Sequence, residues 1–205
     1  MRKFQVAAIA LVASLSLLAQ APKGWKVRAD ESKEASDPDA AGAIKFVTMG
    51  SGFHATNPQA AVYWNPANAA TGTYTLKGTF ILQKPSGHNN YYGLVFGGSA
   101  LEGAQQKYAY FLVSQNGSWL VKTRTGESTG NVGRGSNDAV KKPDASGKST
   151  NALEVRVGPE QTEYVVNGTI VHTAPKSAAF RTDGTWGFRV NHLLEVHVDG
   201  LGVTK

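Results

Sequence analysis

Three polar residues alternate along the last apolar segment of the chain. Glu195, His197 and Asp199 are separated by Val196 and Val198, and residues two apart in a strand point to the same side. Carboxylates beside an imidazole can ligate a divalent metal or act as an acid–base pair. The same spacing equally describes the polar outer face of an ordinary strand. The three residues are therefore weak catalytic candidates.

The histidines give no further sign of a metal site. The chain has five of them, scattered singly, and no His-x-His or His-x-x-x-His pair occurs. We therefore expect no bound metal and no cofactor.

A second group of polar residues is cationic and aromatic. Lys122 and Arg124 alternate in one segment, and Arg189 and Asn191 alternate in another. Sugars are bound by aromatic rings against their C–H faces and by Arg or Asn hydrogen bonds to their hydroxyls. The predicted ligand-binding residues are Tyr108, Tyr110, Lys122, Arg124, Arg189, Asn191 and His197. The alternative is that these charges merely keep an outer sheet face soluble.

This hypothesis requires the strands concerned to be neighbours in one sheet, which alternation alone does not establish. If they are neighbours, Arg189→Ala should weaken sugar binding. It should leave folding stability nearly unchanged, because an outward-facing charge contributes little to folding.

The segments that carry these residues read as β-strands. Apolar residues occupy alternate positions in 153–157, 186–190 and 194–198, which is the period of a strand with one buried face. No stretch has the spacing of an amphipathic helix over a useful length. The residues expected to be buried include Leu153, Val155, Phe188, Val190 and Val196.

Turn signals separate these strands. Asn116-Gly117 and Asn167-Gly168 are strong hairpin signals, since both residue types tolerate a positive φ. Residues 126–150 are rich in Gly, Ser, Lys and Asp and are predicted to form the longest loop. Many short strands joined by such turns predict an all-β fold, a two-sheet antiparallel β-sandwich with little helix.

Four segments carry a resemblance to a known superfamily. They are Tyr92–Gly98, Tyr108–Val113, the Val166-Asn167-Gly168 hairpin and Trp186–Val190. They resemble the concanavalin A-like lectin/glucanase jelly roll over residues 44–205, nearest to secreted bacterial proteins of unassigned function related to 3-keto-glycoside-hydrolase-type domains. The resemblance implies two antiparallel sheets, one of them concave, with glycans commonly bound on or beside the concave face.

The chain departs from the catalytic members of that superfamily. Its retaining glucanases carry a Glu-x-Asp-x-x-Glu or Glu-x-Asp-x-Glu strand, whose two carboxylates act about 5 Å apart as nucleophile and acid. Neither pattern occurs among the fifteen acidic residues. The resemblance therefore favours binding over catalysis.

The first residues predict export. Arg2 and Lys3 precede an apolar run from Val6 to Leu18, and Ala19-Gln20-Ala21 has the small-x-small pattern of a signal-peptidase site. We expect residues 1–21 to be a signal peptide, 22–43 a polar linker or loosely attached first strand, and 44–205 the jelly-roll domain. The mature chain is then secreted or periplasmic, without a membrane span.

The composition argues against a nucleic-acid partner and against stabilisation by disulfides. The net charge is +6 without a dense basic run, which argues against nucleic-acid binding. No cysteine is present, so burial and sheet hydrogen bonds must stabilise the fold.

Three functions follow from these features. The preferred one is an exported carbohydrate-binding, lectin-like module without its own catalysis. The first alternative is a small glycoside hydrolase of the 3-keto-glycoside or glucanase type. The second is a structural or adhesion module that binds protein through a sheet edge.

Overall fold

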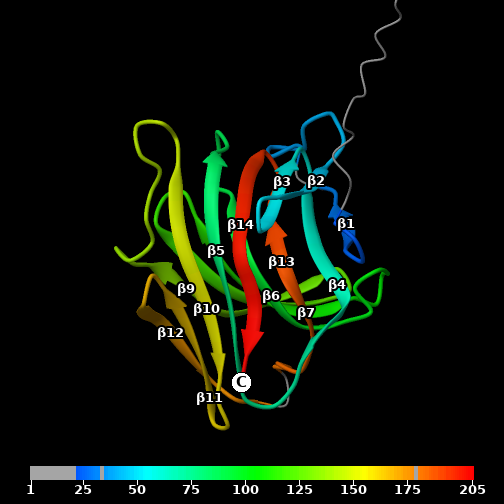
Figure 1. The fold of residues 1–205 in the computed structure, drawn as a ribbon, viewed down its shortest axis with the longest axis vertical. Coiled ribbons are helices and arrows are strands. Elements are labelled where there is room, and N and C mark those ends of the chain that lie inside the picture. Colours follow the sequence, from blue (N-terminus) through cyan, green and yellow to red (C-terminus); the bar gives the residue numbers. More distant parts are fainter. Residues whose placement is uncertain (1–21, 33–34, 178–179) are drawn as a thin grey trace, which may run out of the picture.

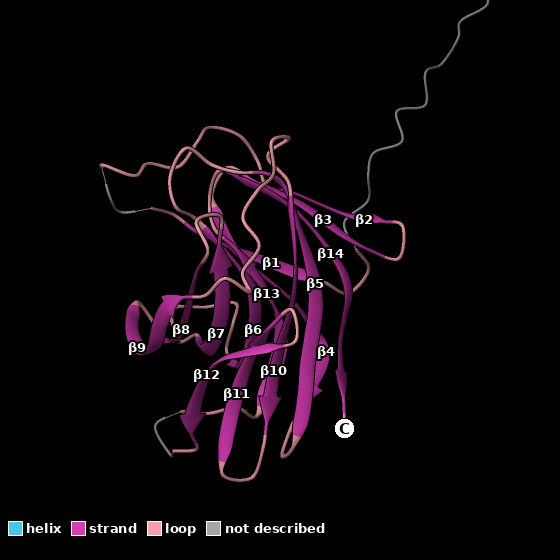
Figure 2. Ribbon diagram, turned by 90° about the vertical axis from the view of Figure 1, so that its left-hand side faces the viewer, coloured by secondary structure: helices cyan, strands magenta, loops and turns pink. Residues whose placement is uncertain are grey.

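Two seven-stranded antiparallel sheets pack face to face in a computed structural model of the chain, which describes residues 22–32, 35–177 and 180–205 (Figure 1). Residues 1–21, which include the expected signal peptide, lie outside the described residues. No helix occurs in the described part (Figure 2), so no described helix could span a membrane. The predicted all-β two-sheet sandwich is confirmed.

Sheet A begins with the N-terminal strand at one edge. Its order is β1 (Lys26–Asp30), β4 (Ala60–Ala70), β13 (Gly184–Val190), β6 (Tyr91–Ser99), β7 (Lys107–Ser114), β8 (Ser118–Thr125) and β9 (Ser128–Ser136).

Sheet B takes the C-terminal strand into its interior. Its order is β12 (Thr169–Pro175), β11 (Gln161–Val166), β10 (Ser149–Val157), β5 (Tyr74–Lys84), β14 (Leu194–Thr204), β3 (Gly52–Asn57) and β2 (Lys45–Met49).

The main core fills the space between the sheets, as alternation predicts. Leu153, Val155, Phe188, Val190 and Val196 are each fully buried. Phe188 stacks on Tyr63 with ring centroids 4.5 Å apart. Burial of such aromatic and branched side chains is the main stabilising contribution in a fold without disulfides.

The N-terminal segment contains a strand, one of the two alternatives expected for residues 22–43, whereas the central loop differs from the sequence-based expectation. Residues 26–30 form β1, which pairs with β4 over five residues, and the preceding Trp25 packs 4.5 Å from Phe53 in the core. The segment 126–150 is not one loop, because β9 lies within it. Alternation could not reveal β9, since its residues are glycine-rich and mostly exposed.

The two hairpin dipeptides form hairpins with different turns. Asn167 and Gly168 both have positive φ (49° and 82°), as predicted for the β11–β12 turn. In the β7–β8 turn only Gly117 does (92°), because that connection has three residues rather than two.

Sheet A also carries apolar residues on its outer face, which alternation did not predict. β7 is buried along both faces, from Tyr108 to Ser114. A second apolar cluster lies on the side away from the main core; its buried members are Val62, Trp64, Val95, Leu101, Tyr108, Tyr110 and Leu112. Part of the outer face of sheet A is therefore apolar and buried, unlike that of an ordinary solvated sheet.

Val155→Ala should lower the free energy of unfolding by about 1–3 kcal/mol, because it removes two methyl groups from a closed core position. Val27→Ala is a matched control, since Val27 is 40% exposed on edge strand β1; it should change stability by less than about 0.5 kcal/mol. Denaturant melts of both variants test the assignment of the core face, and equal losses would contradict it.

Candidate functional site

Four of the predicted ligand-binding residues lie on the outer face of sheet A. Tyr108 of β7 pairs directly with Arg124 of β8, and Tyr110 pairs with Lys122. Directly paired residues share a sheet face, so these four side chains point to the same side.

Arg189 reaches this group from β13. Its Nη1 donates a hydrogen bond to the Tyr108 hydroxyl at 3.2 Å, and its Nε donates one to Asn191 Oδ1 at 3.2 Å. The predicted convergence of Arg189, Asn191, Arg124 and the tyrosines is therefore present in the fold.

His197 does not join them. It lies on β14, in the interior of sheet B, together with Glu195 and Asp199. The expectation that His197 shares a face with Arg189 is wrong. Alternation assigns a side chain to one side of its strand, but the sheet to which that strand belongs depends on long-range pairing.

The residue that organises the cluster is Asp30 of β1. Its carboxylate accepts a hydrogen bond from Arg189 Nη1 and lies 2.9 Å from Arg28 Nη2 and 3.6 Å from Arg124 Nη1. The Asp30 side chain is only 8% exposed. Three guanidinium groups thus surround one buried carboxylate, an arrangement that we call the arginine cluster (Arg28, Asp30, Arg124 and Arg189).

Charge and burial oppose each other in this cluster. Burial by itself would raise the pKa of Asp30. The charge and hydrogen bond of Arg189, together with the charges of Arg28 and Arg124, outweigh burial and hold that pKa below its ordinary value. Burial would likewise lower the pKa of Arg189, and the neighbouring Tyr108 and Asp30 outweigh it and raise that pKa. Asp30 and Arg189 are therefore both charged near neutral pH.

The tyrosines form the floor beneath these charges. Tyr108 is 3% and Tyr110 8% exposed, and burial raises the pKa of Tyr110 to about 12. Their rings are covered, so they do not offer the open aromatic platform that the sequence-based hypothesis assumed. Their role in ligand binding remains a prediction.

The arginine cluster lines a cleft of about 690 Å³ on the outer face of sheet A. The cleft also has amide and carboxylate walls, and the predicted ligand-binding residues Tyr108, Tyr110 and Lys122 are not among its lining residues. Beyond the arginine cluster, the cleft is lined by these residues with polar side chains: Glu31, Ser32, Asp37, Asn90, Glu102, Gln106, Glu127, Asn191 and His192. This volume is within the range typical of small-molecule sites.

A histidine between two carboxylates closes one end of the cleft. His192 Nδ1 lies 2.8 Å from Asp39 and its Nε2 lies 3.1 Å from Asp37. Asn90 Nδ2 donates to the His192 carbonyl at 2.9 Å. These contacts hold the polar segment after β1 against the ends of β6 and β13.

Sequence reasoning missed Arg28, Asp30 and Gln106. A signal for the first two was available, because Lys26, Arg28 and Asp30 alternate with smaller residues and so share a strand face. Gln106 lies in the loop before β7, where no period exists to assign its direction.

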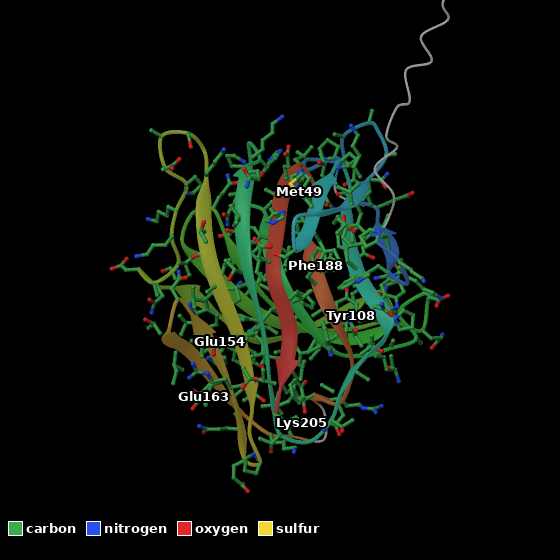
Figure 3. The ribbon with its side chains drawn as sticks, viewed as in Figure 1. Met49, Tyr108, Glu154, Glu163, Phe188 and Lys205 are labelled. Carbon is green, nitrogen blue, oxygen red and sulfur yellow. The ribbon has the colours of Figure 1, made fainter. Side chains whose placement is uncertain are left out.

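The weak catalytic candidates pair within sheet B. His197 Nε2 lies 3.1 Å from Asp199, and Glu195 lies 3.1 Å from Nε2 of His54, the residue opposite His197 on β3. In the part of the chain that the structure describes, no three His, Asp or Glu residues are grouped so as to hold a metal ion. Tyr108 belongs to sheet A, whereas Glu154 and Glu163 belong to sheet B (labelled in Figure 3).

Comparisons with known proteins identify the fold. No model of a protein family matches the sequence, and no curated protein matches it either. Among solved structures, the carbohydrate binding module CBM66 from Bacillus subtilis superposes with a TM-score of 0.60 at 8% identity, over 89% of this chain and 96% of that one. A β-glucanase from Bacillus licheniformis gives 0.56 at 11% identity, over 88% and 92%.

A third similar structure is the potassium-bound carbohydrate recognition domain of Emp46p, with a TM-score of 0.55 at 11% identity over 88% of each chain. The chain has the concanavalin A-like jelly-roll fold. The predicted fold is thus confirmed, a fold that a carbohydrate-binding module and a glucanase share. The finer resemblance to 3-keto-glycoside-hydrolase-type domains remains a prediction.

The arginine cluster changes one expectation for this jelly roll. Arg189→Ala was expected to leave stability almost unchanged, but the Arg189 side chain is 11% exposed and bonded to buried Asp30. We now expect the free energy of unfolding to fall by about 3 kcal/mol, the low end for a broken buried pair, because Arg28 and Arg124 still face Asp30.

The matched control is Arg156→Ala on the outer face of sheet B, whose side chain is 41% exposed. It should cost less than about 1 kcal/mol. Denaturant melts compare the two, and similar small losses would show that the cluster contributes little to stability.

Asp30 should also make stability depend on pH. Because the pKa of Asp30 is lowered in the folded state, the unfolded chain binds the proton more readily. The stabilisation that Asp30 contributes is therefore complete at a pH above its pKa in the unfolded chain. It is lost as the pH falls through its pKa in the folded protein.

Between roughly pH 2 and 5, the free energy of unfolding should therefore fall less steeply with acidification in Asp30→Asn than in the wild type. The variant should already be less stable at neutral pH, because three partly buried guanidinium groups lose their carboxylate. Parallel curves across that range would contradict this account of Asp30.

Proposed function

We propose that the chain is an exported carbohydrate-binding module, lectin-like and without catalysis of its own, and that the saccharide binds in the cleft on the outer face of sheet A. The observation that carries this proposal is the arginine cluster, fixed in the wall of that cleft. Guanidinium groups offer planar, directional donors to ligand oxygens.

The other cleft residues supply complementary groups. Asn90, Gln106 and Asn191 bring amides that can both donate and accept. Arg189 and Asn191 hold each other in place through a hydrogen bond. A site whose polar groups are positioned before the ligand arrives loses less entropy on binding, which suits a module that binds uncharged hydroxyl groups.

The hydrolase alternative depends on Glu195, His197 and Asp199. These residues lie in sheet B, and both carboxylates are engaged by histidines there. None of the three lines the cleft of sheet A. Binding without bond cleavage is therefore the function that the cleft supports best, and release of reducing ends from a bound polysaccharide would contradict it.

Arg124→Ala should weaken saccharide binding. A panel of neutral and acidic polysaccharides is first screened with the wild-type domain, and the affinity for each that binds is then measured by calorimetry. Loss of a charged donor should reduce affinity by about 10- to 150-fold.

Arg156→Ala is the matched control, because Arg156 pairs with Glu154 and Glu163 on the opposite sheet. It should bind like the wild type, and thermal melts should show both variants folded. Loss of binding in Arg156→Ala alone would place the site on sheet B, and a wild-type domain that binds no saccharide would overturn the function.

Export is part of the proposal. Sequencing the N-terminus of the exported protein should find a mature chain that starts near Pro22, because Ala19-Gln20-Ala21 has the pattern that signal peptidase cleaves. Such cleavage leaves β1 intact, since that strand starts at Lys26. Replacing Ala21 with Leu should block processing, and an exported wild-type chain that retains Met1 would contradict the idea.

A further inference from the structure

Several buried polar atoms that lack a hydrogen-bond partner belong to residues that line the cleft. Among the described residues these atoms include Arg28 Nε, Asp37 Oδ1 and Gln106 Oε1. Asp37 still has an ion pair with His192, and Arg28 Nη2 lies beside Asp30. Arg28 Nε and Gln106 Oε1 are therefore the least satisfied.

Gln106 is unusual in being so deeply buried. The residue is 3% exposed, yet its side-chain oxygen accepts no hydrogen bond. Its backbone is fixed on both sides, because its nitrogen donates to the Gly103 carbonyl at 3.2 Å and its carbonyl accepts from Gly126 at 2.7 Å. Buried polar groups in native proteins are almost always partnered, so an unpartnered acceptor held in a cleft wall indicates a place for a ligand.

The two unsatisfied atoms have opposite hydrogen-bonding character. Arg28 Nε only donates and Gln106 Oε1 only accepts. A ligand that satisfies both must offer an acceptor and a donor. Hydroxyl groups do both, whereas an ionised carboxylate or sulfate group can only accept.

The charges around the cleft also disfavour an anionic ligand. The negative charge of Asp30 already compensates part of the positive charge of Arg28, Arg124 and Arg189. Four further carboxylates line the cleft, those of Glu31, Asp37, Glu102 and Glu127. An added negative charge would meet these carboxylates in a partly buried site, where charges interact more strongly than in water.

We infer that the cleft recognises a neutral saccharide, with Arg28 donating to one hydroxyl oxygen and Gln106 accepting from a hydroxyl hydrogen. Arg28 and Gln106 are then the specificity-determining pair. This inference rests on the proposed function and narrows its substrate class.

Matched oligosaccharides test the substrate class. The probes are galacto-, xylo- and cello-oligosaccharides as neutral sugars, and oligogalacturonates of the same length as acidic ones. Calorimetry should find that a neutral probe binds at least tenfold more tightly than the acidic probes. Its affinity should hardly change with added salt, because salt screens charge–charge attraction and leaves neutral hydrogen bonds almost unaffected.

Two variants test the pair. Gln106→Met removes the amide at similar size, and Arg28→Lys keeps the positive charge but removes Nε. Each should lower the affinity for the neutral probe by tenfold or more. Gln106→Met should keep or raise the melting temperature, because a buried unpartnered acceptor destabilises the fold, whereas a purely structural Gln106 would give a lower one.

The controls are Gln161→Met and Arg156→Lys, which change the same residue types on sheet B and should bind like the wild type. The inference is overturned if oligogalacturonate binds more tightly with an affinity that falls as salt rises, or if Arg28→Lys binds the neutral probe like the wild type; either leaves the proposed function standing. If no probe binds the wild type at all, the proposed function fails first.

Discussion

The cleft depends on one buried carboxylate. Asp30 faces Arg28, Arg124 and Arg189, and without it three guanidinium groups would repel one another across a partly buried wall. A buried charge cluster of this kind is stabilising only when its members are well placed. Asp30 therefore fixes the positions of all three arginines at once.

The position of Asp30 is set by the hydrophobic core. Edge strand β1 pairs with β4 on one side only, and a short edge strand is by itself weakly held. Trp25, just before β1, packs within 6 Å of the rings of Phe46, Phe53 and Phe188. The aromatic core thus anchors the strand that carries the carboxylate, and folding stability and cleft geometry are linked through β1.

The apolar side chains beside the arginine cluster strengthen its interactions. Tyr108 and Tyr110 are buried on the outer face of sheet A together with Trp64 and Leu112. They exclude water from one side of the cluster, and the lower local dielectric makes each remaining interaction stronger. In the same environment an unpartnered polar group such as the Gln106 side-chain oxygen destabilises the fold. We therefore assign this oxygen to ligand binding rather than to folding.

The sequence by itself determined the fold class and the direction of many side chains, because the two-residue period of a strand is a local property. It correctly buried Val155 and Phe188, and it grouped Arg124 with Tyr108 and Arg189 with Asn191. It could not place His197 in the opposite sheet or find β9, since sheet membership is decided by pairings between distant segments and β9 lacks apolar alternation. Nor could it show that Asp30 would neutralise Arg189, 159 residues away, or that Gln106 would be buried without a partner. Those contacts exist only because the core brings β1, β8 and β13 to one face of one sheet.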